Sequence, residues 1–147
     1  MSDRVRFIPS PRGTGRVLLI DLTAFASPHE ALEYIAEAGS RVATQPKNSV
    51  RCLVDVTGAR FNGDVVQALK ELAAHNRAYV MASAIVGVTG LQRVILDSVI
   101  KFSSRKNLKS IPTRDEAFAW LAAQDDGAGA TAQPASQVNP GTSSDAR

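Results

Sequence analysis

Several residue types that build common functional sites are scarce in this chain. Its 147 residues include one cysteine, two histidines and 5% aromatic residues. A single thiol, Cys52, cannot form an internal disulfide or a cysteine-rich zinc site, and two histidines do not make a histidine-rich metal centre. No apolar run approaches the roughly 20 residues of a transmembrane helix, and the first residues do not lead into the apolar stretch of a secretory signal. We therefore expect a cytoplasmic protein with no membrane span, no metal and no cofactor.

The charge is unevenly spread along the chain. Residues 124–147 consist of alanine, glycine, serine, proline and polar residues with a single valine. Such a segment buries too little apolar surface to offset its ordering entropy, which predicts one domain over 1–123 and a disordered tail over 124–147. The domain then has 16 basic and 11 acidic residues. This moderate excess is compatible with an anionic partner, but no aromatic residues interleave with the basic ones, so nucleic acid is not expected.

The hydrophobic pattern predicts strands that alternate with helices. The predicted strands lie at 4–9, 16–22, 50–56, 79–88 and 108–111. The short turn between the first two strands favours an antiparallel hairpin, and the later alternation favours parallel strands covered by helices. The expected fold is α/β, a mixed sheet of about five strands with about four helices.

Three segments have the sequence of a helix start. In Ser27–Glu30, Thr89–Gln92 and Thr113–Glu116, a serine or threonine is followed three residues later by Glu or Gln, the pattern of a capping box. In the first of these helices, Gly39 falls on the apolar face. A glycine at that position predicts a close approach to the sheet.

No catalytic motif is evident. The sequence contains no Gly-x-Ser-x-Gly, no phosphate-binding P-loop and no His-Glu-x-x-His. Cys52 lies within an apolar strand, where a thiol usually serves in packing. His75 lies near a helix end, where a cation complements the dipole. An enzyme using Asp55, Thr57, His75 and the 87–90 turn is the least favoured alternative, because no nucleophile–base pair is evident.

Two loops follow predicted central strands, 55–64 and 87–90. Loops at the carboxyl ends of parallel strands are the usual binding edge of an open α/β sheet. Asp55 and Thr57 either belong to a binding site or only tie their loop by hydrogen bonds, and the sequence favours neither. The second loop opens a helix whose free amides suit an anion, although a tight turn needs glycine in any case. Its candidate anion- or ligand-binding residues are Gly87, Thr89 and Gly90.

The segment Asp55-Val56-Thr57-Gly58-x-x-Phe61 before a helix resembles the central motif of STAS domains, the fold of bacterial anti-sigma factor antagonists. The resemblance is greater to SpoIIAA-like bacterial proteins, which share features with STAS domains and with Sec-fourteen-type lipid carriers. It covers about residues 5–122. Its further motifs are Ile20-Asp21-Leu22, Ala84-Ile85-Val86-Gly87-Val88-Thr89-Gly90-Leu91 and Glu116-Ala117-x-x-Trp120-Leu121.

The resemblance implies a non-enzymatic regulatory domain that binds a protein partner. In that family a serine or threonine at the start of the helix after the motif is phosphorylated, but Gly63 and Asp64 stand there and have no hydroxyl. We therefore expect partner binding without the usual phosphoacceptor. The residues expected to bind the partner are Asp55, Thr57, Gly58, Asn62, Gly63, Asp64 and Gln67.

The alternative function is a carrier or sensor of a small apolar or anionic ligand. The third predicted helix has an apolar stripe of Leu91, Val94, Ile95, Ser98, Val99 and Phe102. This stripe is either ordinary core, which is favoured, or part of a pocket against the sheet whose walls would be Leu91, Ile95, Val99 and Phe102. A run of basic residues begins near the end of that helix and is best interpreted as a solvated face. Its members are Lys101, Arg105, Lys106, Lys109 and Arg114. A homodimer is compatible with so small a domain, and no feature of the sequence defines an interface.

Overall fold

A computed structural model describes residues 3–103 and 107–124 of the chain. The elements follow one another as β1 (Val5–Pro9), β2 (Arg16–Asp21), α1 (Pro28–Ala43), β3 (Val50–Asp55), α2 (Gly63–Asn76), β4 (Val80–Val86), α3 (Leu91–Ser103), β5 (Leu108–Ile111) and α4 (Arg114–Ala122). The predicted tail lies outside the described residues, apart from Gln124.

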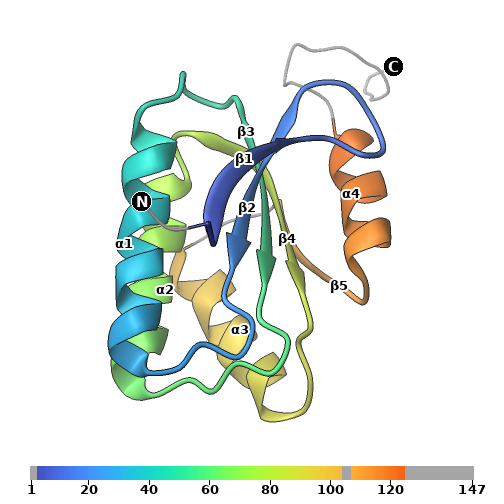
Figure 1. The fold of residues 1–147 in the computed structure, drawn as a ribbon. Helices are drawn as coiled ribbons and strands as arrows, with labels where there is room; N and C mark the ends of the chain where they lie inside the picture. Colours follow the sequence, from blue (N-terminus) through green and yellow to red (C-terminus); the bar gives the residue numbers. More distant parts are fainter. Residues whose placement is uncertain (1–2, 104–106, 125–147) are drawn as a thin grey trace.

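The strands form one mixed sheet in the order β1-β2-β3-β4-β5. β1 pairs with β2 in the antiparallel sense, and every other neighbouring pair is parallel. Helices α1, α2 and α3 cover one face of the sheet, and α4 covers the other (Figure 1). This arrangement confirms the predicted α/β fold, its initial hairpin and its four helices.

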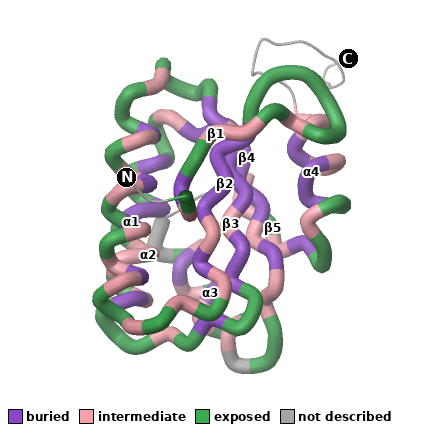
Figure 2. Tube along the Cα trace, in the orientation of Figure 1, coloured by how far each residue is buried: buried purple, intermediate pink, exposed green. Residues whose placement is uncertain are grey.

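Each central strand is apolar on both faces because both faces are covered. In β2, Leu18 and Ile20 face the three-helix side, whereas Val17 and Leu19 face α4. All four side chains are buried. Cys52 of β3 is buried on the three-helix side, in agreement with the packing role predicted for it. Figure 2 shows that burial is concentrated on the inner strands and on the helix faces that meet them.

Local capping explains where two of the helices begin. Ser27 Oγ accepts a hydrogen bond from the Glu30 amide at 3.2 Å, and Thr113 Oγ1 accepts one from the Glu116 amide at the same distance. The Glu30 carboxylate accepts from the Ala26 amide at 2.9 Å, one residue before the cap. Both predicted helix starts are therefore confirmed.

Two predictions about helix faces are wrong. A methyl group on Gly39 would lie 3.5 Å from Leu72 Cδ1, so the close approach of α1 is to α2 rather than to the sheet. In α3, Val94 is 65% exposed, whereas Leu96 and Val99 are buried. Helix α3 is in contact with α2, and Val94 lies outside its buried face.

Arg51 fastens the carboxyl end of α4 to the sheet. Its Nε donates to the Leu121 carbonyl at 3.0 Å, and its Nη2 donates to the Gln124 carbonyl at 2.7 Å. The last carbonyls of a helix have no partners within the helix. Arg51 adds a donor to the Leu121 carbonyl and to the carbonyl of Gln124 just after α4, and its positive charge complements the helix dipole.

The variant Arg51→Met should lower the free energy of unfolding by about 2 kcal/mol, because two charge-assisted hydrogen bonds are lost. Urea unfolding followed by circular dichroism would measure this change. Arg60→Met, at an exposed loop position, is the matched control and should change stability by less than about 0.5 kcal/mol. Equal effects of the two substitutions would contradict the capping role.

Candidate functional site

The carboxyl ends of the parallel strands lie together at one edge of the sheet (Figure 1). The register places Asp21 of β2 opposite Asp55 of β3, Asp55 opposite Val86 of β4, and Val86 opposite Ile111 of β5. The loops after these strands therefore meet at the edge where open α/β sheets commonly bind ligands.

Two aspartates at this edge make the same turn. Asp55 Oδ1 accepts a hydrogen bond from the Thr57 amide at 3.0 Å and from the Thr57 hydroxyl at 2.6 Å. Asp21 Oδ1 accepts from the amide and the hydroxyl of Thr23 at the same distances. Each aspartate thus turns the chain as it leaves the sheet. The repeated Asp-x-Thr pattern is visible in the sequence, but only the Asp55 copy was singled out there.

Arg114, the first residue of α4, reaches both aspartates. Its Nε lies 2.6 Å from Asp55 Oδ2, and its Nη2 lies 4.0 Å from Asp21 Oδ2. Arg4, the residue before β1, also approaches Asp21, with its Nη1 at 3.8 Å from Oδ1. The interpretation of the basic run as a solvated face is therefore wrong for Arg114. The short connection from β5 to α4 brings the Arg114 side chain over the edge of the sheet. Two other members of that run, Arg105 and Lys106, lie outside the described residues.

Asp55 is 5% exposed and is ionised by its surroundings. Burial raises the pKa of this carboxyl, but the hydrogen bonds from Thr57 and Arg114 together outweigh burial, so the pKa lies below its usual value of 3.8. Both carboxylate oxygens are occupied by protein donors. The geometry of Asp55 therefore accords with the structural alternative left open by the sequence, in which this residue ties the loop.

Gly87 lies directly against Thr57 in the neighbouring loop. Its φ is +88°, and a methyl group there would stand 2.6 Å from the Thr57 amide nitrogen. The position therefore requires glycine for its conformation and for the close approach. The Val56 amide donates to the Val86 carbonyl at 2.9 Å beside this contact. The predicted proximity of the two loops is confirmed.

Gln92 joins the two loops from the first turn of α3. Its Oε1 accepts from the Thr89 amide at 3.3 Å, and its Nε2 donates to the Ala59 carbonyl at 2.7 Å. The glutamine of the predicted capping box is thus in place. Gly90 has φ +49°, which also favours glycine. Gly87, Thr89 and Gly90 form a compact turn in which the Thr89 amide already has a protein acceptor.

The loop between β3 and α2 presents a polar surface. Asn62 is the N-cap of α2, with its Oδ1 accepting from the Val65 amide at 2.9 Å. Asp64 lies in the first turn of α2, where a negative charge is favourable. We call this surface the α2 rim; its exposed residues are Thr57, Gly58, Asn62, Gly63, Asp64 and Gln67. Of the residues expected to bind a partner, only Asp55 is buried and lies outside the rim.

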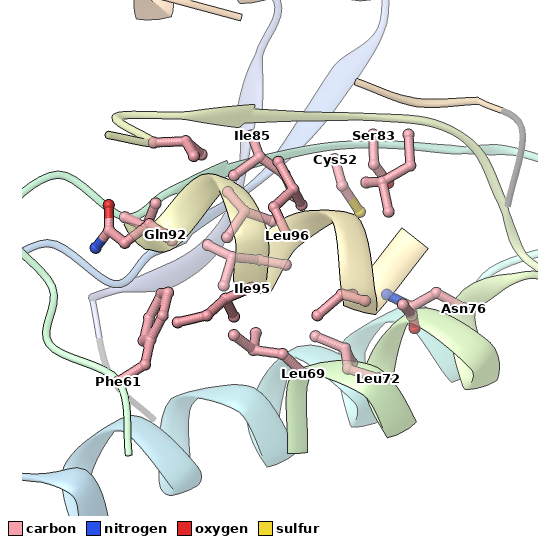
Figure 3. Close-up of a pocket in the computed structure, with 17 residues that line it drawn as sticks. Cys52, Phe61, Leu69, Leu72, Asn76, Ser83, Ile85, Gln92, Ile95 and Leu96 are labelled. Carbon is pink, nitrogen blue, oxygen red and sulfur yellow. The ribbon is translucent and has the colours of Figure 1, made fainter. Parts of the chain in front are cut away.

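A cavity of about 60 Å³ lies between the sheet and helices α2 and α3 (Figure 3). Its lining is mainly apolar and comes from all the parallel strands, β2 to β5, from helices α2 and α3, and from the loop residues Val56, Phe61 and Val88. Ile95 and Val99, two of the four residues predicted as pocket walls, line it. The side chains of the other two, Leu91 and Phe102, lie outside the described residues.

The residues of the enzyme alternative do not come together. Asp55, Thr57 and Gly87 lie at the carboxyl edge, but His75 lies in the last turn of α2, with its Nε2 3.1 Å from the Gly39 carbonyl. Within the described residues, no group of three or more His, Cys, Asp and Glu side chains is placed to hold a metal ion.

Comparisons with known proteins add no family to this description. No family model, no curated protein and no solved structure matches the chain significantly. Among the described residues, no helix has the length and apolar character needed to cross a membrane. The fold and the site together define an α/β domain with a polar rim at the carboxyl edge of a five-stranded mixed sheet and an apolar cavity between that sheet and two helices.

Replacing Arg114 by Met should lower the free energy of unfolding by about 2 kcal/mol, because a buried carboxylate would lose its cationic partner. Lys101→Met is the matched control from the same basic run and should have little effect, because Lys101 is exposed. Chemical denaturation of both variants measures the difference. A variant at Arg114 as stable as the wild type would show that the ion pair contributes nothing.

Stability should also depend on pH through Asp55. Because its pKa in the folded protein lies below 3.8, the unfolded chain binds the proton more readily. The stabilising contribution is present above the unfolded pKa and is lost as the pH falls through the folded pKa. The variant Asp55→Asn should therefore show a shallower loss of stability below pH 4 than the wild type, as measured by urea unfolding at a series of pH values. Parallel curves would count against this assignment.

Proposed function

We propose that this protein is a non-enzymatic regulatory domain that binds a protein partner through the α2 rim. The observation that supports the proposal is that the side chains of this rim are exposed while hydrogen bonds hold its backbone in place. Thr57, Asn62 and Asp64 are exposed. Asp55, the Asn62 cap and the Gln92 bridge all restrain the backbone behind them. A surface that is already ordered loses little conformational entropy when it binds.

The order of elements and the Asp55-Val56-Thr57-Gly58 motif support a relationship to SpoIIAA-like STAS domains. Within that relationship, the position of the usual phosphoacceptor is Gly63 or Asp64 at the start of α2. Asp64 supplies a permanent negative charge there. We infer that partner binding is constitutive at this position rather than switched by phosphorylation.

The proposal is tested by reversing one charge on the rim. Asp64→Arg should reduce capture of the partner from a lysate of the native cell at least about tenfold, because a charge of the wrong sign in an interface costs several kcal/mol. Glu33→Arg, also an exposed acid on a helix, is the matched control and should capture the partner normally. Quantitative mass spectrometry of the captured proteins gives the ratio.

Circular dichroism of both variants verifies that the fold is kept. Recovery of the same proteins in the same amounts by wild type and by Asp64→Arg would refute docking on the α2 rim. A size-exclusion measurement of the wild type shows whether the partner is a second copy of the chain.

The second candidate function is the carrier of a small ligand, and one observation favours it. The cavity beneath α3 is lined by Ile95 and Val99, two of the four residues that this alternative names as walls. This cavity lies between helices and sheet, whereas the α2 rim faces outward, so the two functions use different surfaces.

A further inference from the structure

The edge of the sheet opposite the α2 rim is basic. The described segments that meet there, at the amino ends of β2, β3 and β4, are 10–16, 41–51, 74–80 and 120–124 (Figure 1). These segments contain no aspartate or glutamate. Their basic residues are Arg12, Arg16, Arg41, Lys47, Arg51 and Arg77.

Ion pairs and helix ends account for only part of this positive charge. Arg12 Nη1 lies 2.8 Å from Asp115 Oδ2, and Arg41 Nη2 lies 3.3 Å from Glu37 Oε2. Helices α1, α2 and α4 end at this edge, and each carboxyl-terminal end carries about half a negative charge. These groups do not balance the basic side chains, so the edge attracts a negatively charged group.

A groove of about 380 Å³ opens at this edge, between the start of β2 and the loop from α1 to β3. Its lining is mainly polar and includes Arg16, Gln45, Asn48, Ser49 and Arg51. No acidic residue is among the described residues that line it. The volume lies within the range of ligand pockets, about 300–1,000 Å³, and is sufficient for two side chains.

Hydrogen bonds hold one wall of this groove in place. The Asn48 amide donates to the Ala78 carbonyl at 3.0 Å, and the Ser49 hydroxyl donates to the Pro46 carbonyl at 2.6 Å. The groove is therefore formed before anything binds in it, which lowers the entropic cost of binding.

Arg16 places a cation in the groove. Its Cζ lies 4.2 Å from the centroid of the Phe7 ring, and its Nη2 donates to Gln45 Oε1 at 3.3 Å. Both of these partners are neutral. A guanidinium has five N–H donors, and Gln45 accepts from one of them. Arg16 therefore has donors left for a carboxylate.

The chain leaves α4 beside this groove. Arg51, which lines the groove, donates from its Nη2 to the Gln124 carbonyl at 2.7 Å. The next two residues in the sequence are Asp125 and Asp126. Two residues of extended chain span about 7 Å. Because this acidic pair follows a residue that is bound to the groove lining, its effective concentration at the groove is high.

We propose that the groove binds the acidic pair Asp125 and Asp126 of this chain, and that one of the two carboxylates pairs with Arg16. The charge of the groove and the position of Gln124 favour this occupant over a free anion or an acidic segment of another protein. In this arrangement the chain shields its own basic groove. The groove lies at the opposite edge of the sheet from the α2 rim, so the inference is independent of partner binding there.

The ion pair can be tested through the guanidinium hydrogens of Arg16, whose exchange with water is measured by NMR. A carboxylate that accepts from Arg16 slows this exchange. In the full chain, replacing both acids by Asp125→Asn and Asp126→Asn should speed the exchange about threefold, the size expected of a weak ion pair at a protein surface. Asp145→Asn is the matched control from the same part of the chain and should leave the rate unchanged. Arg6, an exposed arginine of the same hairpin, serves as the internal reference.

Two further variants separate the groove from the overall charge of the edge. Arg16→Gln should shift the amide resonances of Asp125 and Asp126, because it removes their partner. Lys47→Gln removes the same charge at the same edge but outside the groove lining, and it should shift them far less. Circular dichroism verifies that both variants are folded.

Each result decides one part of the inference. An Arg16 exchange rate that the double variant leaves unchanged would overturn the role of the two aspartates and would leave the groove to a free anion or an acidic partner. Equal shifts in Arg16→Gln and Lys47→Gln would overturn the groove as the binding site, since the edge would then act only through its overall charge.

Discussion

Arg114 donates from the start of α4 to Asp55 at the end of β3, and this contact holds the carboxyl edge of the sheet together. The other oxygen of Asp55 holds Thr57, and Thr57 in turn lies against Gly87. A chain of contacts therefore runs from the helix on one face of the sheet, through a buried carboxylate, to the two loops at the edge. A carboxylate this deeply buried is favourable only because all its donors are in place.

The loop after β3 contributes to both candidate surfaces. Phe61 lines the cavity, whereas Asn62 and Asp64 lie on the outside at the start of α2. Gln92 binds the same loop to α3 through the Ala59 carbonyl. The polar rim and the apolar cavity are thus joined by a few residues of backbone, although one is exposed to solvent and the other lies under a helix.

Elements with strong local signals could be predicted from the sequence. Ser27 and Thr113 begin helices because their hydroxyls satisfy amides three residues away, a contact that requires no distant part of the chain. The apolar strand segments also predicted the sheet. Successive residues of β2 are apolar, and such a strand must be covered on both of its faces. Asn62 was expected in a partner site, and its capping of α2 was missed because no Glu or Gln follows at the third position.

Features that depend on distant contacts could not be predicted in the same way. The ion pair of Arg114 joins residues 59 positions apart, and composition alone placed this arginine in a solvated basic run. The burial of Val94 could not be judged from the sequence, because Val94, Ile95 and Leu96 are consecutive apolar residues that point to different sides of α3, and only Leu96 is buried.

The sequence by itself determined the α/β class, the antiparallel start of the sheet and the helix caps, because hydrophobic period and side-chain-to-backbone hydrogen bonds act over a few residues. Only the tertiary structure decided which charges meet at the sheet edge and that Gly87 lies against Thr57. These outcomes follow from how whole elements pack, because the contacts join residues far apart in the sequence.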